Sequence, residues 1–114
     1  KVHISWQVAR TGAGKIAGFD WDEGNRRKCR KHGVSRREVE SLFDEDRPVT
    51  ILPDVSNSRE EPRFRAIGNT HEGRHVFVVF AIRVREGKSY VRPISARYMH
   101  RREIEHYEKE SPGF

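Results

Sequence analysis

The chain has 114 residues, of which 34% are hydrophobic and 35% are charged, and its formal net charge is +6 at pH 7. This length and composition fit one domain with a single thin core, and six Phe, three Tyr and two Trp argue against a disordered chain. The excess of Lys and Arg favours an anionic partner, which could be RNA, DNA or an acidic protein.

A single cysteine, Cys29, rules out an intrachain disulfide and favours a reducing compartment. We expect Cys29 to be a packing or surface thiol on a helix rather than a nucleophile. The sequence has no run of about 20 apolar residues that could span a membrane, and its first residues lack the apolar core of a secretion signal. We therefore expect a cytoplasmic protein with no membrane partner.

The first 18 residues differ in pattern from the remainder of the chain. Thr11–Gly14 is typical of a loop, whereas His3–Val8 alternates apolar and polar residues, as an added edge strand or an unstructured lead would. We expect residues 1–18 to be an N-terminal extension, for which an origin in the gene model or in protein production is one explanation. Residues 19–114 then form the functional domain.

The next segment predicts a short strand followed by two helices. Phe19 and Trp21 alternate with acidic residues as in a strand. Asp22 is suited to cap a helix over Glu23–Lys31, because an acidic side chain complements the positive end of the helix dipole. Ser35–Glu38 has the pattern of a capping box, which begins a second helix.

Glycine and apolar residues indicate how these two helices end and pack. Gly33 fits the C′ position that ends the first helix. Val34 and Val39 have the spacing of a hydrophobic staple around the second helix. Val39, Leu42 and Phe43 then supply an apolar face at i, i+3 and i+4, which we expect to lie against the core.

Four strands are expected after the second helix, arranged as an antiparallel meander. They cover Val49–Leu52, Phe64–Gly68, Val76–Val84 and Tyr90–Arg97. The third of them is apolar on both faces for most of its length, which predicts a central position in the sheet. Pro93 cannot donate a hydrogen bond to a neighbouring strand, so we expect a bulge there or an edge position for the last strand.

A last helix is expected to begin near His100. The run His100–Glu103 resembles a capping box, although histidine is a poor cap. Met99 and Ile104 have the spacing of a staple, and Ile104 and Tyr107 form the inner face of the helix. The predicted order is β-α-α-β-β-β-β-α, which places the chain in the α+β class.

The segment between Asn25 and Val39 is strongly basic. It holds seven Lys and Arg residues against one acidic residue, Glu38, and His32 lies among them. A dense positive field with a titratable imidazole inside it suits a protein that holds a polyanion. Charge alone does not indicate cleavage.

Four short stretches, in the same order and at the same spacing, match a known family pattern. They are Phe19–Asp22, Lys31–Ser35, Arg63–Phe64 with Ile67–Gly68, and Ile94–Arg97 followed by Arg101–Glu103. On these stretches the chain resembles the BrnT family, the toxins of bacterial type II toxin–antitoxin pairs. The resemblance runs from about Phe19 to Glu108, so that residues 19–114 are expected to form a BrnT-like toxin domain.

The resemblance implies a RelE-like fold, in which two N-terminal helices and one C-terminal helix pack on a small antiparallel sheet. It also implies ribonuclease activity on mRNA that inhibits translation, and neutralisation by a BrnA-like antitoxin that binds DNA. DNA would then be contacted only through the antitoxin. No cofactor is expected.

The chain departs from the family pattern in three places. Residues 1–18 precede the usual start, and Pro93 replaces an aliphatic strand residue. His100 stands where Thr, Asn or Ser usually caps the helix. This last change adds an imidazole between Arg97 and Arg101, and leaves open whether the site works as in relatives.

RNA can be cleaved without a metal ion because its own 2′-OH can attack the adjacent phosphorus. The enzyme has to remove the hydroxyl proton, stabilise the extra charge on the phosphorane and protonate the leaving 5′-oxygen. Histidine, with an ordinary pKa of about 6.5, suits either proton transfer. Arginine suits the phosphorane, because its planar fork binds two phosphate oxygens. We therefore expect a metal-independent endoribonuclease.

The candidate site residues come mainly from the matching stretches. They are Lys31, His32, Arg63, Arg97 and Arg101 as catalytic residues, with Glu103, Tyr107, Ser95 and His100 in support. We assign proton transfer to His32 and phosphate binding to Arg63 and Arg97. No metal site is expected, because His71 and His75 lack further ligands at a suitable spacing.

Each assignment has a structural alternative. His32 could satisfy carbonyls at the helix end, and Lys31 could be a solvated partner of the helix dipole. The two strand arginines could be ordinary edge cations, Glu103 a capping-box residue and Tyr107 a core residue. For the whole protein, the alternative is a non-catalytic module that binds nucleic acid or only the antitoxin.

Overall fold

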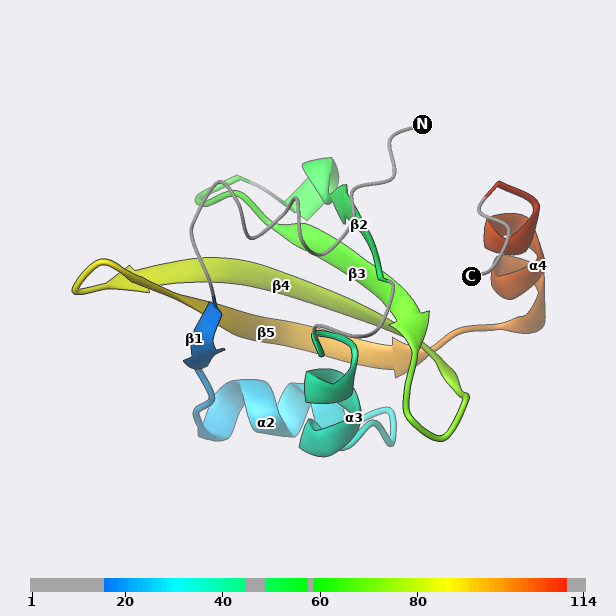
Figure 1. Ribbon diagram of the computed structural model, residues 1–114, viewed down its shortest axis with the longest axis horizontal. Coiled ribbons are helices and arrows are strands. Elements are labelled where there is room, and N and C mark those ends of the chain that lie inside the picture. Colours follow the sequence, from blue (N-terminus) through cyan, green and yellow to red (C-terminus); the bar gives the residue numbers. More distant parts are fainter. Residues whose placement is uncertain (1–15, 45–48, 58, 111–114) are drawn as a thin grey trace.

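A five-stranded sheet forms the centre of the computed structural model, which describes residues 16–44, 49–57 and 59–110 (Figure 1). The elements are β1 (Ile16–Phe19), α2 (Glu23–Arg30), α3 (Arg36–Ser41), β2 (Thr50–Pro53), the 3₁₀ helix η1 (Val55–Asn57), β3 (Phe64–Asn69), β4 (His75–Arg85), β5 (Lys88–Tyr98) and α4 (Arg101–Glu110). Apart from the short η1, this order confirms the predicted β-α-α-β-β-β-β-α sequence of an α+β domain. The alternating segment His3–Val8 lies outside the described residues.

The sheet has the order β1-β5-β4-β3-β2, with β1 parallel to β5 and all other pairs antiparallel. It is therefore a mixed sheet, and the prediction of an antiparallel sheet was wrong for β1. Hydrophobic alternation identifies a strand but not the partner with which it pairs. The first strand also ends at Phe19 rather than including Trp21, whose indole N–H donates to Glu40 at 2.8 Å. The central position predicted for β4 is confirmed.

Helices α2 and α3 lie together along one face of the sheet (Figure 1). Val39, Leu42 and Phe43 of the second helical segment are buried there, as their spacing predicted. Phe43 meets Phe80 of β4 edge to face, with ring centroids 5.2 Å apart. Cys29 of α2 is also buried in this cluster, so of the two expected kinds of thiol, packing and surface, it is the packing kind.

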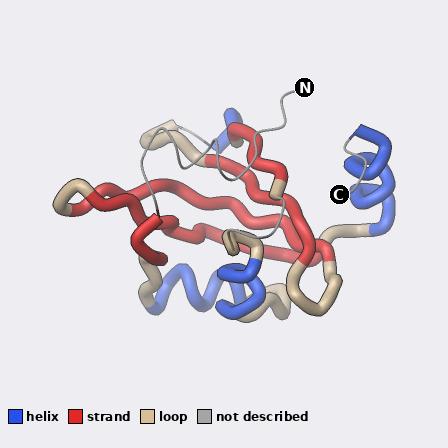
Figure 2. Tube along the Cα trace, viewed as in Figure 1, coloured by secondary structure: helices blue, strands red, loops and turns tan. Residues whose placement is uncertain are grey.

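Among the described elements, α4 covers one end of the opposite face, away from the β4–β5 turn (Figure 2). Ile67 and Phe77 are paired across β3 and β4 and pack there with Met99, Ile104 and Tyr107. The residues before and after Ile67 and Phe77 on each strand point toward the core on the α2 and α3 side, because side chains alternate between the two faces.

Within the described ranges, no helix is long and apolar enough to cross a membrane.

The helix ends follow the predicted capping pattern closely. Asp22 caps α2 in a capping box with Asn25, and Ser35 caps α3 in a capping box with Glu38. Gly33 has a positive φ of 88°, but α2 ends at a cap on Lys31, so the glycine follows one position later than predicted. This left-handed turn joins the two helices at a tight corner.

The side chain of Asn25 ties α2 to the sheet and is 4% exposed. Its amide nitrogen donates to the carbonyl of Asp20 at 2.9 Å and to the carbonyl of Pro93 at 2.8 Å, while its oxygen accepts from the Asp22 N–H at 2.8 Å. The pairing of β4 with β5 shifts register at this point, which leaves Ile94 as an extra residue. The bulge predicted from Pro93 is therefore confirmed.

Helix α4 is joined to β5 by an ion pair. Both guanidinium Nη atoms of Arg97 lie 2.8 Å from the two carboxylate oxygens of Glu103, and the guanidinium carbon lies 4.5 Å from the ring centroid of Phe77. Glu103 also accepts from the backbone N–H of His100 at 2.9 Å, which is one of the two hydrogen bonds of a capping box. The pair lowers the pKa of Glu103 from 4.5 to about 2.

Replacing Asn25 should destabilise the whole domain. We expect Asn25→Ala to lower the free energy of unfolding by roughly 2–4 kcal/mol, because the carbonyls of Asp20 and Pro93 and the N–H of Asp22 each lose a hydrogen bond. Urea denaturation measures this change. Asn25→Asp, which keeps the shape but removes both donors, should also destabilise, whereas Arg26→Ala on the exposed face should not. A loss below about 0.5 kcal/mol for both Asn25 variants would contradict this account.

The Arg97–Glu103 pair should make stability depend on acid. Because the folded pKa of Glu103 lies below its ordinary value of 4.5, the pair contributes fully above pH 4.5 and loses its contribution as the pH falls toward about 2. Urea denaturation across this range should show the wild type and Glu103→Gln converging in stability, while Glu105→Gln keeps the wild-type slope. If the difference in the free energy of unfolding between wild type and Glu103→Gln did not change with pH, this role of the Arg97–Glu103 pair would be wrong.

Candidate active site

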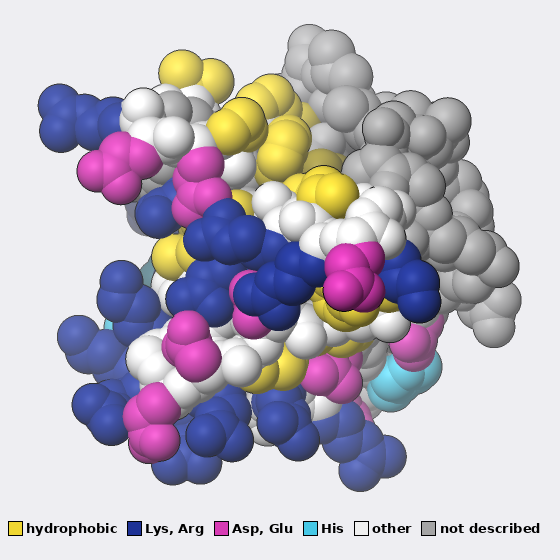
Figure 3. All heavy atoms as spheres, turned by 90° about the vertical axis from the view of Figure 1, so that its left-hand side faces the viewer, with side chains coloured by type: hydrophobic (Ala, Val, Ile, Leu, Met, Phe, Trp, Pro, Cys, Tyr) yellow, Lys and Arg dark blue, Asp and Glu magenta, His cyan; other side chains and the backbone are white. Residues whose placement is uncertain are grey.

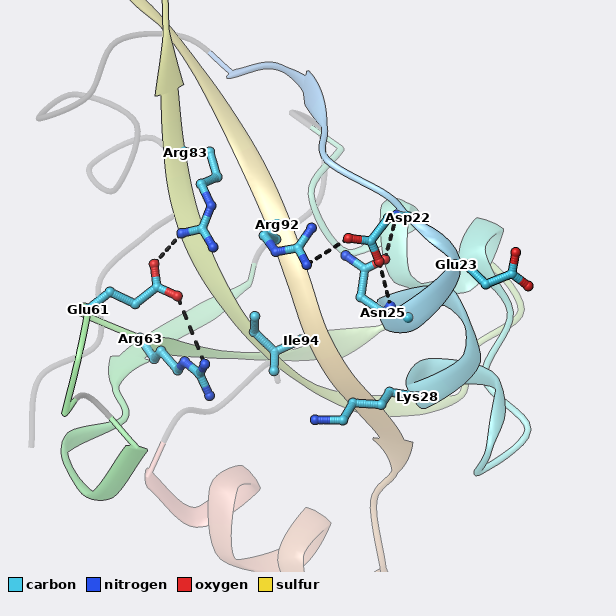
Figure 4. Close-up of a pocket in the computed structure, with 10 residues that line it drawn as sticks. Asp22, Glu23, Asn25, Lys28, Glu61, Arg63, Arg83, Arg92 and Ile94 are labelled. Atoms are coloured by element: carbon cyan, nitrogen blue, oxygen red, sulfur yellow. Dashed lines mark hydrogen bonds and ion pairs between the residues drawn. The ribbon is translucent and has the colours of Figure 1, made fainter.

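A basic groove crosses the sheet face that α2 and α3 leave open. It consists of a larger hollow of about 540 Å³ and a smaller one of about 290 Å³, which share Lys28, Arg63 and Ile94. The smaller hollow is completed by Lys31, His32, Val79 and Ser95. Figure 4 shows Lys28 and Arg63 reaching toward one another past Ile94 from opposite sides. We refer to both hollows together as the groove.

The last turn of α2 supplies one wall of the groove. Lys28 lies in the last turn of α2, Lys31 is its C-cap and His32 follows in the next turn, and all three side chains line the smaller hollow. Cys29 faces the core next to them, and Asn25 holds the preceding turn against β5. The sequence predicted Lys31 and His32 as site residues but not Lys28. Its position three and four residues before them was a usable signal.

The sheet supplies the floor and the other wall. Ser95 lies directly opposite Val79 on β4, and both line the smaller hollow. The bulge allows consecutive residues, Ile94 and Ser95, to line the groove together. Arg63 precedes β3, and its guanidinium lies 3.9 Å from a carboxylate oxygen of Glu61. The structure thus brings four predicted residues together, namely Lys31, His32, Arg63 and Ser95.

The other predicted residues lie near α4 and line neither hollow. The fork of Arg97 is occupied by Glu103, so in this conformation it is not open to a phosphate. Arg101 is exposed on the first turn of α4, and His100 is exposed just before it. Tyr107 is half-buried against the second apolar cluster, which fits the core alternative.

The imidazole of His32 is exposed at the rim of the smaller hollow. Two carbonyls at the end of α2, those of Arg27 and Arg30, are satisfied without it by the backbone N–H groups of Lys31 and Gly33. The ring of His32 forms no hydrogen bond with any described residue. The ring is therefore placed to exchange protons with a group in the hollow.

Two further arginines, which sequence reasoning missed, line the larger hollow. Arg83 pairs with Glu61, and Arg92 pairs with Asp22 at 2.8 Å (Figure 4). The hydrogen bond from Arg83 is the main cause that lowers the pKa of Glu61. Residues 83 and 92 are nine residues apart along the hairpin and become neighbours only through its register, which the sequence does not specify.

Basic side chains are numerous on one side of the molecule. Figure 3 shows Lys and Arg side chains gathered on the side that carries the β4–β5 turn, with Asp and Glu between them.

Burial raises the pKa of the Cys29 thiol to about 11, so a thiolate is disfavoured at neutral pH. Among the described residues, no group of three or more His, Cys, Asp and Glu side chains is arranged to hold a metal ion.

The smaller hollow has the groups that phosphoryl chemistry requires. An imidazole can move a proton at neutral pH, and Lys28, Lys31 and Arg63 can stabilise negative charge that develops on a phosphate. Ser95 adds a hydroxyl that can donate a hydrogen bond. The arrangement can bind a phosphodiester and assist its cleavage.

Comparison with known families agrees with this chemistry. The family model described as the ribonuclease toxin BrnT of type II toxin–antitoxin systems matches residues 21–103, which include every residue of the groove. No curated protein matches the chain. A type II toxin acts with an antitoxin protein as its partner, and a ribonuclease acts on RNA. Because the match spans most of the chain, the protein belongs to the BrnT family of ribonuclease toxins.

Proposed function

We propose that the protein is a cytoplasmic endoribonuclease that cleaves mRNA without a metal ion and thereby inhibits translation. One observation carries the proposal: the smaller hollow gathers His32 with Lys28, Lys31 and Arg63 inside the region that the family model matches. The 2′-OH of the substrate attacks the adjacent phosphorus, so the protein has to supply only proton transfer and charge stabilisation.

Each group in the smaller hollow has a proposed role. His32 moves the proton of the reacting hydroxyl or of the leaving 5′-oxygen. Arg63 and the two lysines hold the scissile phosphate and stabilise the phosphorane. Ser95 positions a phosphate oxygen from the bulged strand.

The residues near α4 have a second proposed role. A phosphate that displaces Glu103 from the fork of Arg97 would gain a bidentate contact of the same kind. Arg101 and His100 stand at the same end of α4 and would meet the RNA beyond the cleaved bond. Tyr107 supports Arg97 through its place in the second apolar cluster.

The proposed partner is a BrnA-like antitoxin that binds DNA, so that the toxin contacts DNA only indirectly. A RelE-like arrangement is proposed for the fold, supported by helices on both faces of a small sheet. A non-catalytic module that binds nucleic acid or antitoxin is the competing function, and the occupied fork of Arg97 is the observation that favours it.

Removing the imidazole should suppress cleavage, and removing metal ions should not. We expect His32→Ala to lower the cleavage rate by about 10²–10⁴-fold, the usual contribution of a general acid or base. The measurement follows end-labelled RNA, free and on translating ribosomes, with and without EDTA. Products should carry 2′,3′-cyclic phosphate ends.

The matched control for this experiment is His71→Ala, which removes an exposed histidine of the β3–β4 turn that lines neither hollow. Metal-independent chemistry would be excluded if EDTA abolished cleavage and added Mg²⁺ or Zn²⁺ restored it. RNA that is bound but intact in every sample would support the non-catalytic alternative.

Removing the guanidinium of Arg63 should slow the chemical step. We expect Arg63→Ala to reduce kcat by about 10²–10³-fold, as for loss of one donor to a developing oxyanion. Arg63→Lys should recover only part of the rate, because lysine keeps the charge but not the fork. Arg27→Ala, on an exposed arginine paired with Glu23, serves as the charge-matched control and should leave kcat unchanged. Equal losses in the Arg63 and Arg27 variants would point to general charge rather than a defined role.

A further inference from the structure

The larger hollow differs chemically from the smaller one because carboxylates line it and pair with its two additional arginines. Arg83 is joined to Glu61, and Arg92 is joined to Asp22. The side chains of Arg92 and Glu61 are only 21% and 28% exposed, so these groups are held in place within the hollow. In Figure 4 the two pairs lie on different sides of Ile94.

Three carboxylates make the larger hollow a poor place for a second phosphate. Asp22, Glu23 and Glu61 all line it, and like charges repel at this range. The pKa of Glu61 is lowered chiefly by Arg83, and that of Asp22 by the N–H of Asn25 and then by Arg92, so both stay ionised at neutral pH. In the described part of the chain, no carboxylate lines the smaller hollow. The RNA backbone therefore suits the smaller hollow and an uncharged polar group suits the larger one.

A nucleobase fits the larger hollow in size and in polarity. The hollow measures about 540 Å³, and the half-buried Ile94 gives it an apolar floor. Bases that are splayed out of single-stranded RNA stack on guanidinium planes and form hydrogen bonds along their edges. The paired side chains offer such a base both N–H donors and carboxylate acceptors.

We propose that the larger hollow binds the base of the nucleotide next to the cleaved phosphate and selects guanine through Glu61. Guanine alone among the four RNA bases presents two adjacent donors, N1–H and N2–H, to a single carboxylate. Its O6 and N7 atoms accept from a guanidinium, which Arg83 or Arg92 supplies. The proposal rests on the proposed function for the identity of the polymer.

Of the two carboxylates that pair with Arg83 and Arg92, Glu61 has the greater acceptor capacity to spare. One of its oxygens accepts from Arg83, whereas the other lies 3.9 Å from Arg63, beyond ordinary hydrogen-bond length. Asp22 already accepts from the N–H of Asn25 and from Arg92. Because the two hollows share Arg63, a phosphate held there places the adjoining base beside Glu61.

Binding of single nucleotides tests this inference without any cleavage. The full chain is titrated with the 2′-O-methyl 3′-monophosphates of guanosine, adenosine, cytidine and uridine, and binding is followed by NMR. Guanosine should bind about tenfold more tightly than the other three, the size of one good bidentate base contact. Glu61→Gln should reduce that preference to less than about twofold, while Glu23→Gln, a variant of an exposed carboxylate at the same hollow, should keep it.

An inosine nucleotide provides a second measurement that needs no variant. Inosine lacks the N2 amino group, so it should bind the wild type about fivefold or more weakly than guanosine. Equal affinities for the four nucleotides, equal affinities for inosine and guanosine, or an unchanged preference in Glu61→Gln would each overturn the proposal. Because no bond is broken, guanine selection without RNA cleavage would refute only the proposed function, and cleavage without selection would refute only this inference.

Discussion

The buried amide of Asn25 is the constraint on which the site depends. It forms hydrogen bonds with the backbone just after β1, with the N-cap of α2 and with the carbonyl of Pro93 at the bulge. One side chain therefore fixes the helix against β5. An amide satisfied on three sides tolerates little displacement, because each lost partner leaves a buried polar group unpaired. The next turn of α2 then carries Lys28 to the groove, and the bulge turns Ile94 and Ser95 toward it.

The two hollows differ in their carboxylates, although they share Arg63, which pairs with Glu61. Lys28, Lys31 and His32 reach the smaller hollow from the end of α2 and the turn that follows it, and no described carboxylate lines that hollow. Arg83 and Arg92 stand in the larger hollow with carboxylate partners, which orient them while cancelling their net charge. The smaller hollow therefore suits a phosphodiester, and the larger hollow suits a base, which needs both hydrogen-bond donors and acceptors. Phosphate and base would then bind in adjoining parts of one groove.

Local signals in the sequence predicted the helices and strands well, because caps, staples and the bulge at Pro93 are short-range features. The pairing of β1 with β5 was not predictable, since alternation carries no information about partners. For the site, Lys31, His32 and Arg63 came from the family resemblance and do share a hollow. Arg83 and Arg92 were missed because only the hairpin register makes them neighbours, and the engagement of Arg97 by Glu103 required knowledge of where α4 packs.

If the proposed function is right, RNA occupies the groove rather than the exposed basic faces of α2 and α3. NMR titration of the labelled chain with a 2′-O-methyl oligonucleotide, which binds without being cleaved, distinguishes the two surfaces. We expect the largest chemical-shift changes on the ring of His32 and on the amides of Lys28, Arg63 and Ser95. Changes confined to exposed cations such as Arg37, with the groove signals unmoved, would contradict this expectation.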